Sequence, residues 1–269
     1  IHVHGTEKNF GLLRKYLNSE IPIVCSIQGV ISPCYDGLKV SIANTAIKRH
    51  RSIKNYLGRG GVSYALRKWK QFIPIEREVY IINKYFIGRT NWDKAYMMSI
   101  NPEAIYFHGE ELLRNEFYNK KWDIDKCERY RIFISSAVYP LKGLHILMKA
   151  VALLKKDYPQ VNIVAPLAEF DSMSVQLKDY LIKEDYANYL KSLVRKLGIE
   201  DNVIFRKKLS ASEMVDEYCK AHVFVLPSFI ENSPNALGES MSTGVPSVVS
   251  FVGGVPYIVE DNKSTQMFT

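Results

Sequence analysis

The sequence contains no long apolar run. Hydrophobic residues make up 47% of the 269 positions, but they never continue for the roughly 20 residues that a helical membrane span needs. We expect no signal peptide, because the chain opens on Ile1 without a basic start. We therefore expect a cytoplasmic protein. Its abrupt first and last residues lead us to expect that the natural chain extends beyond both ends.

Cysteine is scarce, and the chain lacks a C-x-x-C pair, so the four cysteines are predicted to be reduced thiols. The six histidines are not clustered as zinc ligands would be. Asp123 and Asp125 form a D-x-D pair, but it falls in a polar linker and not at a strand end. We expect no metal site and no bound cofactor.

Acidic residues are rare in one part of the chain. The net charge is +8, and residues 44–94 alone hold twelve basic and three acidic residues, a balance of 12 − 3 = +9. Aromatic residues are interleaved with the basic ones. Such a surface attracts anions. An anionic membrane surface, a diphosphate-bearing acceptor and a solvated face without a partner all fit; nucleic acid is not expected, because no nucleic-acid motif accompanies the charge.

The second half of the chain alternates between apolar strands and amphipathic helices. Strands are predicted at 131–135, 161–165, 203–205, 223–226 and 247–249. Helices are predicted from 143 to 157, around 190–197 before Gly198, from a cap at Ser212, and from 234 to 243. This order indicates an α/β fold with a parallel sheet, whose ligands bind at the carboxyl ends of the strands.

The first half is less regular. It predicts a helix over 7–17 and strands at 21–27, 80–82 and 104–107, while residues 30–78 show no clear period and are left unassigned. The chain turns strongly polar after Tyr118. We place a domain boundary there, with one domain over 1–124 and a second over 125–269.

The stretch from Leu226 to Val249 carries most of the chemistry. Ser233 suits a helix N-cap and Pro234 the first helical position. The free amides of Asn235 and Ala236 then form an anion site with the helix dipole. Two carboxylates flank this site, Glu231 before the helix and Glu239 about two turns along it. Together they can bind two sets of sugar hydroxyls around a diphosphate.

Six segments of the sequence resemble the retaining family-4 glycosyltransferases. They are the E-x(7)-E spacing of 231–239, the basic loop 139–147, and the segments 253–261, 2–7, 26–29 and 88–93. The resemblance implies the GT-B architecture, with two Rossmann-like domains whose parallel sheets face each other across a cleft. The first domain, truncated at its start, is expected to bind the acceptor. The second, truncated at its end, is expected to bind the nucleotide sugar.

The resemblance also implies roles for individual residues. Glu231 is expected to bind the donor hexose, Glu239 the ribose, and Lys142 the diphosphate, where it stabilises the leaving group. The amides of Asn235 and Ala236, together with Ser233, assist. The donor is expected to be a UDP- or GDP-hexose, used without a metal and without a protein nucleophile. The expected acceptor is a glycan or a lipid-linked sugar at the inner membrane face.

Three positions depart from the family pattern. Ala137 stands where the family usually has an arginine, so Arg206 or Lys207 is the candidate for the second phosphate cation. Pro234 replaces a glycine and has no amide to donate. Gln28 replaces a histidine, and either it or His4 is expected on the acceptor side with Arg89. These departures also fit a non-catalytic glycan- or nucleotide-binding protein on a decayed scaffold.

Overall fold

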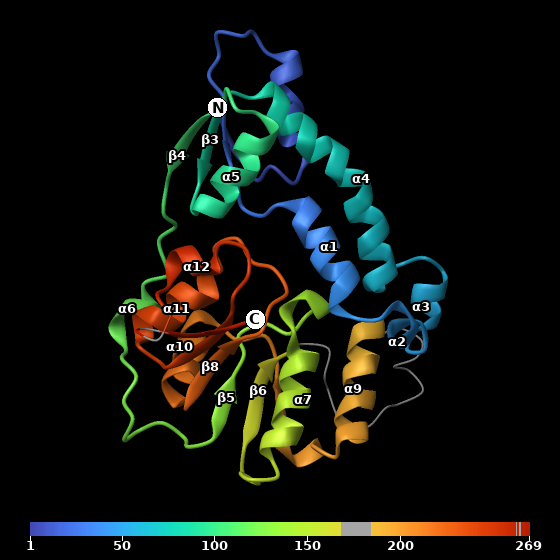
Figure 1. Cartoon of the computed structure of the whole chain (residues 1–269), viewed down its shortest axis with the longest axis vertical. Helices are drawn as coiled ribbons and strands as arrows, with labels where there is room; N and C mark the ends of the chain where they lie inside the picture. The colour runs from blue at the N-terminus through green and yellow to red at the C-terminus, as the bar shows by residue number, and fades with distance from the viewer. Residues whose placement is uncertain (168–183, 262, 264) are drawn as a thin grey trace.

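The computed structural model describes residues 1–167, 184–261, 263 and 265–269 and contains two parallel β-sheets (Figure 1). The first sheet has the strand order β1-β2-β3-β4, and the second has the order β10-β9-β8-β5-β6-β7. The strands of the first sheet are β1 His2–His4, β2 Val24–Ser26, β3 Tyr85–Gly88 and β4 Ile105–His108. Those of the second are β5 Arg131–Phe133, β6 Asn162–Pro166, β7 Val203–Arg206, β8 Val223–Leu226, β9 Ser247–Ser250 and β10 Thr265–Phe268.

Helices connect the strands and cover the sheets. Those before β5 are η1 Asn9–Tyr16, α1 Ile31–Ser41, α2 Asn44–Lys48, α3 Ile53–Tyr56, α4 Gly61–Ile82, α5 Asn91–Ile100 and α6 Glu116–Asn119. Those after β5 are η2 Pro140–Lys142, α7 Leu144–Leu154, α9 Asp185–Leu197, η3 Glu200–Asn202, α10 Ala211–Lys220, α11 Asn235–Thr243 and α12 Val255–Ile258. The predicted α/β class with two parallel sheets is confirmed.

The second sheet follows the sequence prediction closely, although the cap of α10 differs from it. Ser210, and not Ser212, caps α10, since its hydroxyl accepts a hydrogen bond from the amide of Glu213 while the Glu213 carboxylate reaches back to the Ser210 amide. This reciprocal pair is a capping box. Gly198 ends α9 and Gly244 ends α11, both in the left-handed conformation that glycine favours.

The first half of the chain differs more from the prediction. The strand expected at 80–82 is wrong, because these residues are the last turn of α4, and β3 begins only at Tyr85. Tyr80 is fully buried beside Phe86 of β3, so its apolar character serves a helix end packed on the sheet. The predicted helix at 7–17 is a 3-10 helix over Asn9–Tyr16. The unassigned region 30–78 is largely helical, from α1 to α4.

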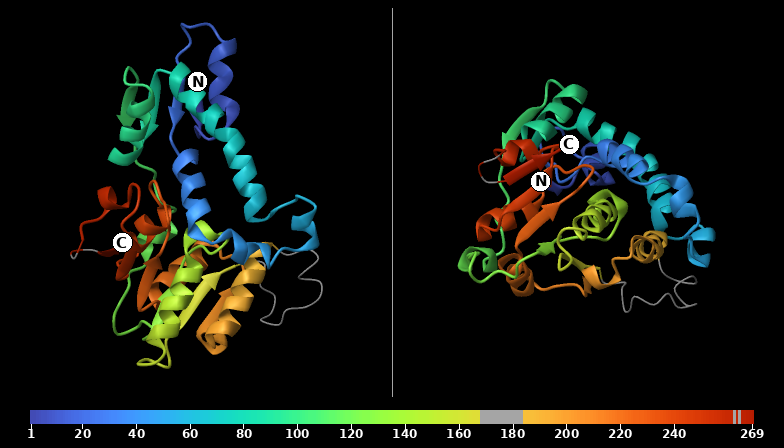
Figure 2. Two further views of the ribbon diagram at one scale, coloured as in Figure 1. Left: turned by 45° about the vertical axis from the view of Figure 1, so that its right-hand side comes forward. Right: turned by 60° about the horizontal axis from the view of Figure 1, so that its bottom comes forward.

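Helices α1 to α4 lie beside both sheets (Figure 2). At one end, α4 packs against η1 and α5 of the first sheet; at the other, α2 and α4 pack against α9 of the second. Leu38, Ile47 and Val62 accordingly belong to the same apolar core as α7 and α9. The boundary at residues 124 and 125 stays a prediction, and these helices are the part of the chain that crosses from one sheet to the other.

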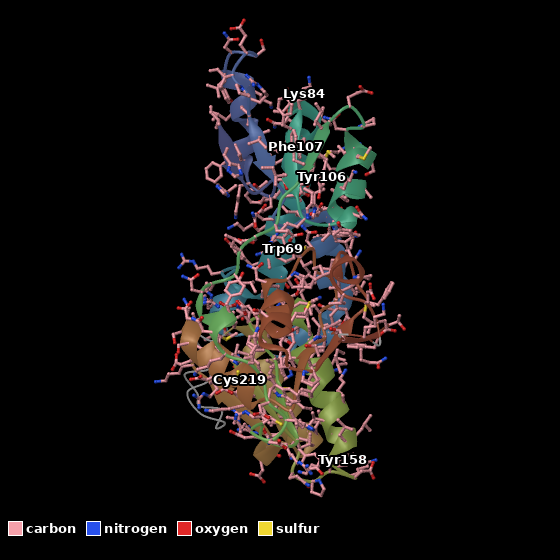
Figure 3. All side chains as sticks on the ribbon, turned by 90° about the vertical axis from the view of Figure 1, so that its left-hand side faces the viewer. Trp69, Lys84, Tyr106, Phe107, Tyr158 and Cys219 are labelled. Carbon is pink, nitrogen blue, oxygen red and sulfur yellow. The ribbon has the colours of Figure 1, made fainter. Side chains whose placement is uncertain are left out.

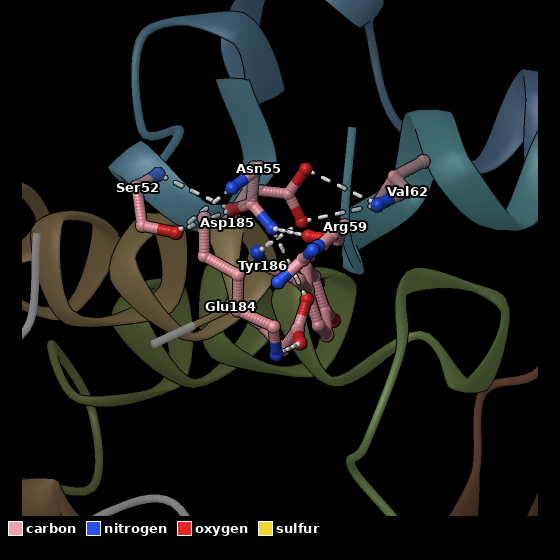
Figure 4. A network of polar contacts seen from close by, with 8 residues as sticks. Ser52, Asn55, Arg59, Val62, Glu184, Asp185 and Tyr186 are labelled. Carbon is pink, nitrogen blue, oxygen red and sulfur yellow. Dashed lines mark hydrogen bonds and ion pairs between the residues drawn. The ribbon is translucent and has the colours of Figure 1, made fainter. Parts of the chain in front are cut away.

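A polar network fixes this crossing point (Figure 4). The Asp185 carboxylate at the start of α9 accepts hydrogen bonds from the Val62 amide at the start of α4, at 3.2 and 3.1 Å. Beside it, Glu184 pairs with Lys54 at 2.6 Å and accepts a hydrogen bond from Asn55. The Asp185 carboxylate therefore serves the first turns of both α4 and α9, while Glu184 joins the start of α9 to α3.

Two sequence predictions concern absences. All four cysteines are free; Cys219 lies in the half of the molecule built on the second sheet (Figure 3). Among the described residues, no helix is long and apolar enough to cross a lipid bilayer.

Candidate functional site

The carboxyl ends of the two sheets face each other. The residues just after β3 and the loop that follows β8 are in direct contact: Thr90 donates a hydrogen bond to Asn232 at 2.9 Å, and Arg89 donates one to Asn235 at 3.1 Å. Parallel sheets bind their ligands at this end. The loops after β5 and β8 therefore lie at the edge where a parallel sheet binds its ligands.

Lys142 and Glu231 come together as predicted. Their side chains form an ion pair with a distance of 2.5 Å between Nζ and Oε1, and the Ser228 hydroxyl donates to the same carboxylate oxygen at 2.7 Å. Burial disfavours the charged form of Lys142, but the charge and hydrogen bond of Glu231, together with Tyr139 and Cys34, raise the pKa of the ammonium above its usual value. A cation and a carboxylate are thus fixed against each other between the loops after β5 and β8.

Gly143 allows the loop after β5, which carries Lys142, to pack directly against the end of β8. It follows Lys142 with φ of 74°, and a Cβ built on it would lie 1.8 Å from the carbonyl oxygen of Pro227. Only glycine allows the loop after β5 to press against the end of β8 this closely. The backbone hydrogen bond from Phe229 to Leu141, at 2.9 Å, holds the two loops together. Gly143 therefore fixes the position of the backbone that carries the Lys142 side chain.

Helix α11 begins one residue later than predicted. Its cap position is Pro234, which offers no side-chain cap, so Ser233 is not the N-cap. The amides of Asn235 and Ala236 are the first two of the helix and have no acceptor inside it. Ser233, Pro234 and Asn235 line a cavity of about 330 Å³ together with Arg89 and residues of the linker after β4. The predicted anion-binding end of the helix therefore opens into the cleft.

Glu239 lies further along α11 and is 7% exposed. Its carboxylate accepts hydrogen bonds from Arg114 at 3.0 Å and from the hydroxyl of Tyr218 at 3.2 Å. Burial raises the pKa of Glu239, and the arginine and the tyrosine oppose that rise in part. Sequence reasoning found Glu239 but missed both partners, because Arg114 stands in the polar linker and Tyr218 reads as a core residue of α10.

The residues predicted on the acceptor side also meet. The Arg89 guanidinium donates to Gln28 at 3.2 Å and pairs with Glu111 at 2.5 Å. His4, Gln28 and Arg89 line a second cavity of about 330 Å³, which shares Arg89, Glu110 and Glu111 with the first. The two hollows therefore adjoin, one at the carboxyl edge of the first sheet and one at the tip of α11.

Asn232 was not predicted. It is 8% exposed, and besides its bond from Thr90 it donates to Asp93 at 3.0 Å and to the carbonyl oxygen of Gln28 at 3.5 Å. Glu231 comes directly before Asn232 in the sequence, and Asn235, at the start of α11, comes three residues after it. This side chain therefore fastens the loop that carries Glu231 to the first sheet.

The structure does not bring Arg206 or Lys207 to the Lys142–Glu231 pair. Both stand at the end of β7, an edge strand separated from β5 by β6. The Arg206 guanidinium lies 3.8 Å from Glu217 of α10, and Lys207 is exposed. Asp123 of the D-x-D pair bonds Lys126 at 2.7 Å. In the described part of the chain, no group of histidine, cysteine and acidic side chains could hold a metal ion.

Solved structures place this architecture among the GT-B glycosyltransferases. Sucrose-phosphate synthase from Thermosynechococcus elongatus matches with a TM-score of 0.69 and 17% identity, over 99% of this chain and 59% of that one. Anabaena HepE, in complex with UDP and glucose, gives 0.61 and 16% identity, over 92% and 58%. WaaG, a glycosyltransferase involved in lipopolysaccharide biosynthesis, gives 0.59 and 12%, over 96% and 66%. At these identities the likeness concerns the fold.

The sequence profile named glycosyl transferases group 1 matches residues 115–268, more than half of the chain. The protein therefore belongs to that family. The D-inositol 3-phosphate glycosyltransferase of Streptomyces avermitilis is 31% identical over 129 residues. That match covers 47% of this chain and 26% of the relative's length.

Proposed function

We propose that this glycosyltransferase moves a hexosyl unit from a UDP- or GDP-sugar to a glycan or lipid-linked acceptor, with retention of anomeric configuration and without a metal. The observation that carries the proposal is the Lys142–Glu231 ion pair beside the open end of α11, with the buried Glu239 further along the same helix. These groups, on the loops after β5 and β8 and on α11, supply separate partners for hexose, diphosphate and ribose.

Each donor-side group has a defined task in this proposal. The Lys142 ammonium leaves Glu231 to pair with the diphosphate and stabilises the negative charge that develops on the leaving nucleotide. Glu231, released from the lysine, accepts hydrogen bonds from hexose hydroxyls. The amides of Asn235 and Ala236 donate to the phosphates. Glu239 accepts from the ribose. The structure of HepE in complex with UDP-glucose gives a precedent for such a donor in this fold.

Arg206 and Lys207 are the candidates for further cations around the donor. Ala137, at the usual arginine position, is fully buried. Arg206 and Lys207 stand at the carboxyl edge of the same sheet, two strands from β5. Because neighbouring strands are about 4.8 Å apart, a long side chain from β7 reaches the outer end of a nucleotide more easily than the phosphate next to Lys142. We assign Arg206 and Lys207 to the part of the donor that lies farthest from Lys142.

The acceptor is proposed to enter through the cavity at the edge of the first sheet. His4, Gln28 and Arg89 line it with Glu110 and Glu111. Counting the arginine against the two glutamates gives 1 − 2 = −1 for this lining, whereas the whole chain carries +8. Carboxylates and an amide are good partners for sugar hydroxyls. The lining therefore suits the uncharged, hydroxyl-rich end of a glycan.

Donor turnover tests the proposal. A panel of UDP- and GDP-hexoses is incubated with the protein, and release of the nucleotide is followed with and without added glycan acceptors. We expect turnover of at least one donor and its loss in both Glu231→Ala and Lys142→Ala. Nucleotide binding without any turnover would instead support the non-catalytic alternative that Ala137 and Pro234 suggest.

The proposed contact with the inner membrane face rests on residues 44–94. Their basic residues stand near exposed apolar side chains: Ile53 is 54% exposed, Tyr56 70% and Leu57 73%. Anionic lipid attracts such a surface electrostatically. Sedimentation with vesicles tests this part separately. We expect binding to vesicles that contain phosphatidylserine and much weaker binding to neutral ones at 0.1 M salt. Equal binding to both would rule out the electrostatic role.

A further inference from the structure

The contact between Arg114 and Glu239 joins the linker after β4 to helix α11. Arg114 Nη2 lies 3.0 Å from Glu239 Oε1, and the two residues are 125 positions apart in sequence. The guanidinium also lies over the ring of the buried Phe117, 4.9 Å from its centre. The arginine is therefore held from two sides although its side chain is 52% exposed.

The other oxygen of Glu239 has a fixed partner too. The Tyr218 hydroxyl lies 3.2 Å from Oε2, and Tyr218 is fully buried, so its ring cannot move far. One donor thus faces each carboxylate oxygen, and the Tyr218 hydroxyl shares its single proton between Glu239 and the carbonyl oxygen of Ala236 at 3.0 Å. Because an ionised carboxylate can accept about four hydrogen bonds, roughly half of its capacity remains for a ligand. Two neighbouring hydroxyls of a ribose match that remainder in number and spacing.

We propose that Arg114 is a positioning residue for the nucleotide: it orients the Glu239 carboxylate so that both of its oxygens can accept hydrogen bonds from the ribose hydroxyls. This inference rests on the ribose role proposed above for Glu239. Arg114 does not itself touch the sugar. Its effect on binding passes through Glu239 and depends on the presence of the ribose hydroxyls.

A merely structural ion pair predicts something different. With one partner half-exposed, the pair adds little to the stability of the fold, and its removal would change all ligands equally or none. Long-range attraction between a positive charge and an anionic nucleotide would also act equally on ribose and deoxyribose forms. The ribose dependence therefore separates positioning from both explanations.

The experiment compares UDP with 2′-deoxy-UDP by titration calorimetry on the full chain. Arg114→Met keeps the aliphatic contact with Phe117 and removes the guanidinium. Arg129→Met is the matched control, since Arg129 is exposed and its substitution changes the net charge equally. We expect Arg114→Met to weaken UDP binding about tenfold, the size of one lost charge-assisted hydrogen bond. The control should stay within about twofold.

Measurements with 2′-deoxy-UDP complete a thermodynamic cycle of two proteins and two ligands. We expect 2′-deoxy-UDP to bind the wild type about tenfold more weakly than UDP, with little further loss in Arg114→Met. Arg114→Lys keeps the charge without the planar fork and should restore binding only in part. A pH series gives a second readout. In the wild type, the ratio of UDP to deoxy-UDP affinity should fall as the pH is lowered and Glu239 is protonated. In Arg114→Met, where this ratio is already close to one, it should stay constant with pH.

Two results overturn the inference. If the wild type binds UDP and Arg114→Met binds UDP equally well, or loses both ligands to the same extent, Arg114 does not act through the ribose. If neither UDP nor GDP binds the wild type, the nucleotide role of Glu239 fails, and the inference fails with it. The first result leaves the proposed function standing and the second does not. Thermal unfolding of each variant confirms that the fold is retained.

Discussion

Lys142 and Glu231 form an ion pair that water reaches only in part: their side chains are 20% and 10% exposed. Each charge therefore depends on the other. Among the residues that the structure describes, Lys142→Met leaves the Glu231 carboxylate with only the Ser228 hydroxyl as a side-chain partner. We expect a loss of about 2–3 kcal/mol in the free energy of unfolding, measured by urea denaturation.

The double variant Lys142→Met/Glu231→Gln is the control for this prediction. It removes both charges, so it should recover part of the stability lost in Lys142→Met. We expect both variants to be inactive. A single variant as stable as the wild type would show that Glu231 is well solvated without the lysine, and the proposed electrostatic role of the pair would lose its basis.

At this scale, sequence reasoning finds residues inside motifs and misses the residues that hold them. Glu231, Glu239 and Lys142 stand in segments with a recognisable order. Arg114 and Asn232 carry no such signal, because their importance comes from partners 125 and 139 positions away. Such contacts depend on how the two sheets meet, which spacing along the chain does not express.

Helix α1 is capped by another helix. Its own cap residue, Val30, has no side chain suited to the task, and the Ile31 amide instead donates to both oxygens of Glu76 on α4, each at 3.0 Å. Glu76 is 1% exposed. Burial raises its pKa to about 7; the amides of α1 work against that rise, and nearby Glu7 adds to it. The helix contact is therefore sensitive to pH.

The sign of this dependence follows from the direction of the shift. The unfolded chain loses the Glu76 proton near pH 4.5 and the folded chain near pH 7, so stability from this group is full below the first value and declines up to the second. We expect the free energy of unfolding to fall by about 2–3 kcal/mol more between pH 5 and 8 in the wild type than in Glu76→Gln. Glu78→Gln, on the same helix but 42% exposed, should keep the wild-type slope; equal slopes in all three proteins would exclude Glu76 as the cause.

Glycines at two helix boundaries provide a paired test of backbone geometry. Gly143 and Gly198 both have left-handed φ, 74° and 62°, but a Cβ would collide with Pro227 at the first and meet nothing within 4 Å at the second. Gly198→Ala should therefore cost about 1 kcal/mol from backbone strain alone. Gly143→Ala should cost several times more and abolish donor turnover, because the loop that carries Lys142 must move. Similar losses of stability in the two variants would contradict the close approach.

The elements of the second sheet could be predicted because each repeats one rule, an apolar strand followed by a helix with one apolar face. The rule fails for α4. This helix contains Pro74 and packs against the first sheet at one end and α9 at the other, so its apolar residues do not follow one face. Its last turn, Tyr80 to Ile82, was mistaken for a strand for the same reason.

The whole molecule depends on how its two sheets are joined. The helices α1 to α4 make one connection, through the network around Asp185, and the loop at Asn232 makes another on the cleft side. The general class, two parallel sheets facing across a cleft, was predictable from the family resemblance. The joints were not, since each pairs segments more than a hundred residues apart and their amides and carboxylates give no periodic signal.

The cleft-side joint is open to a direct test by Asn232→Asp. In the wild type, the Asn232 amide nitrogen donates to the Asp93 carboxylate at 3.0 Å, and its oxygen accepts from Thr90 at 2.9 Å. The aspartate keeps the acceptor but places two carboxylates in contact, where like charges repel. We expect the loop that carries Glu231 to separate from the first sheet. Hydrogen exchange in peptides covering 85–101 and 227–243 should accelerate about tenfold or more, because opening this joint then costs less free energy.

Asn119→Asp, an exposed asparagine outside the cleft, makes the same chemical change and should leave the exchange of both peptides unaltered. Donor turnover should fall in Asn232→Asp and not in the control, because Glu231 and the first sheet must hold donor and acceptor in one geometry. Slow, wild-type exchange in Asn232→Asp would mean that the helices α1 to α4 alone set the relative position of the sheets. The amide at position 232 would then have only a local role in the loop.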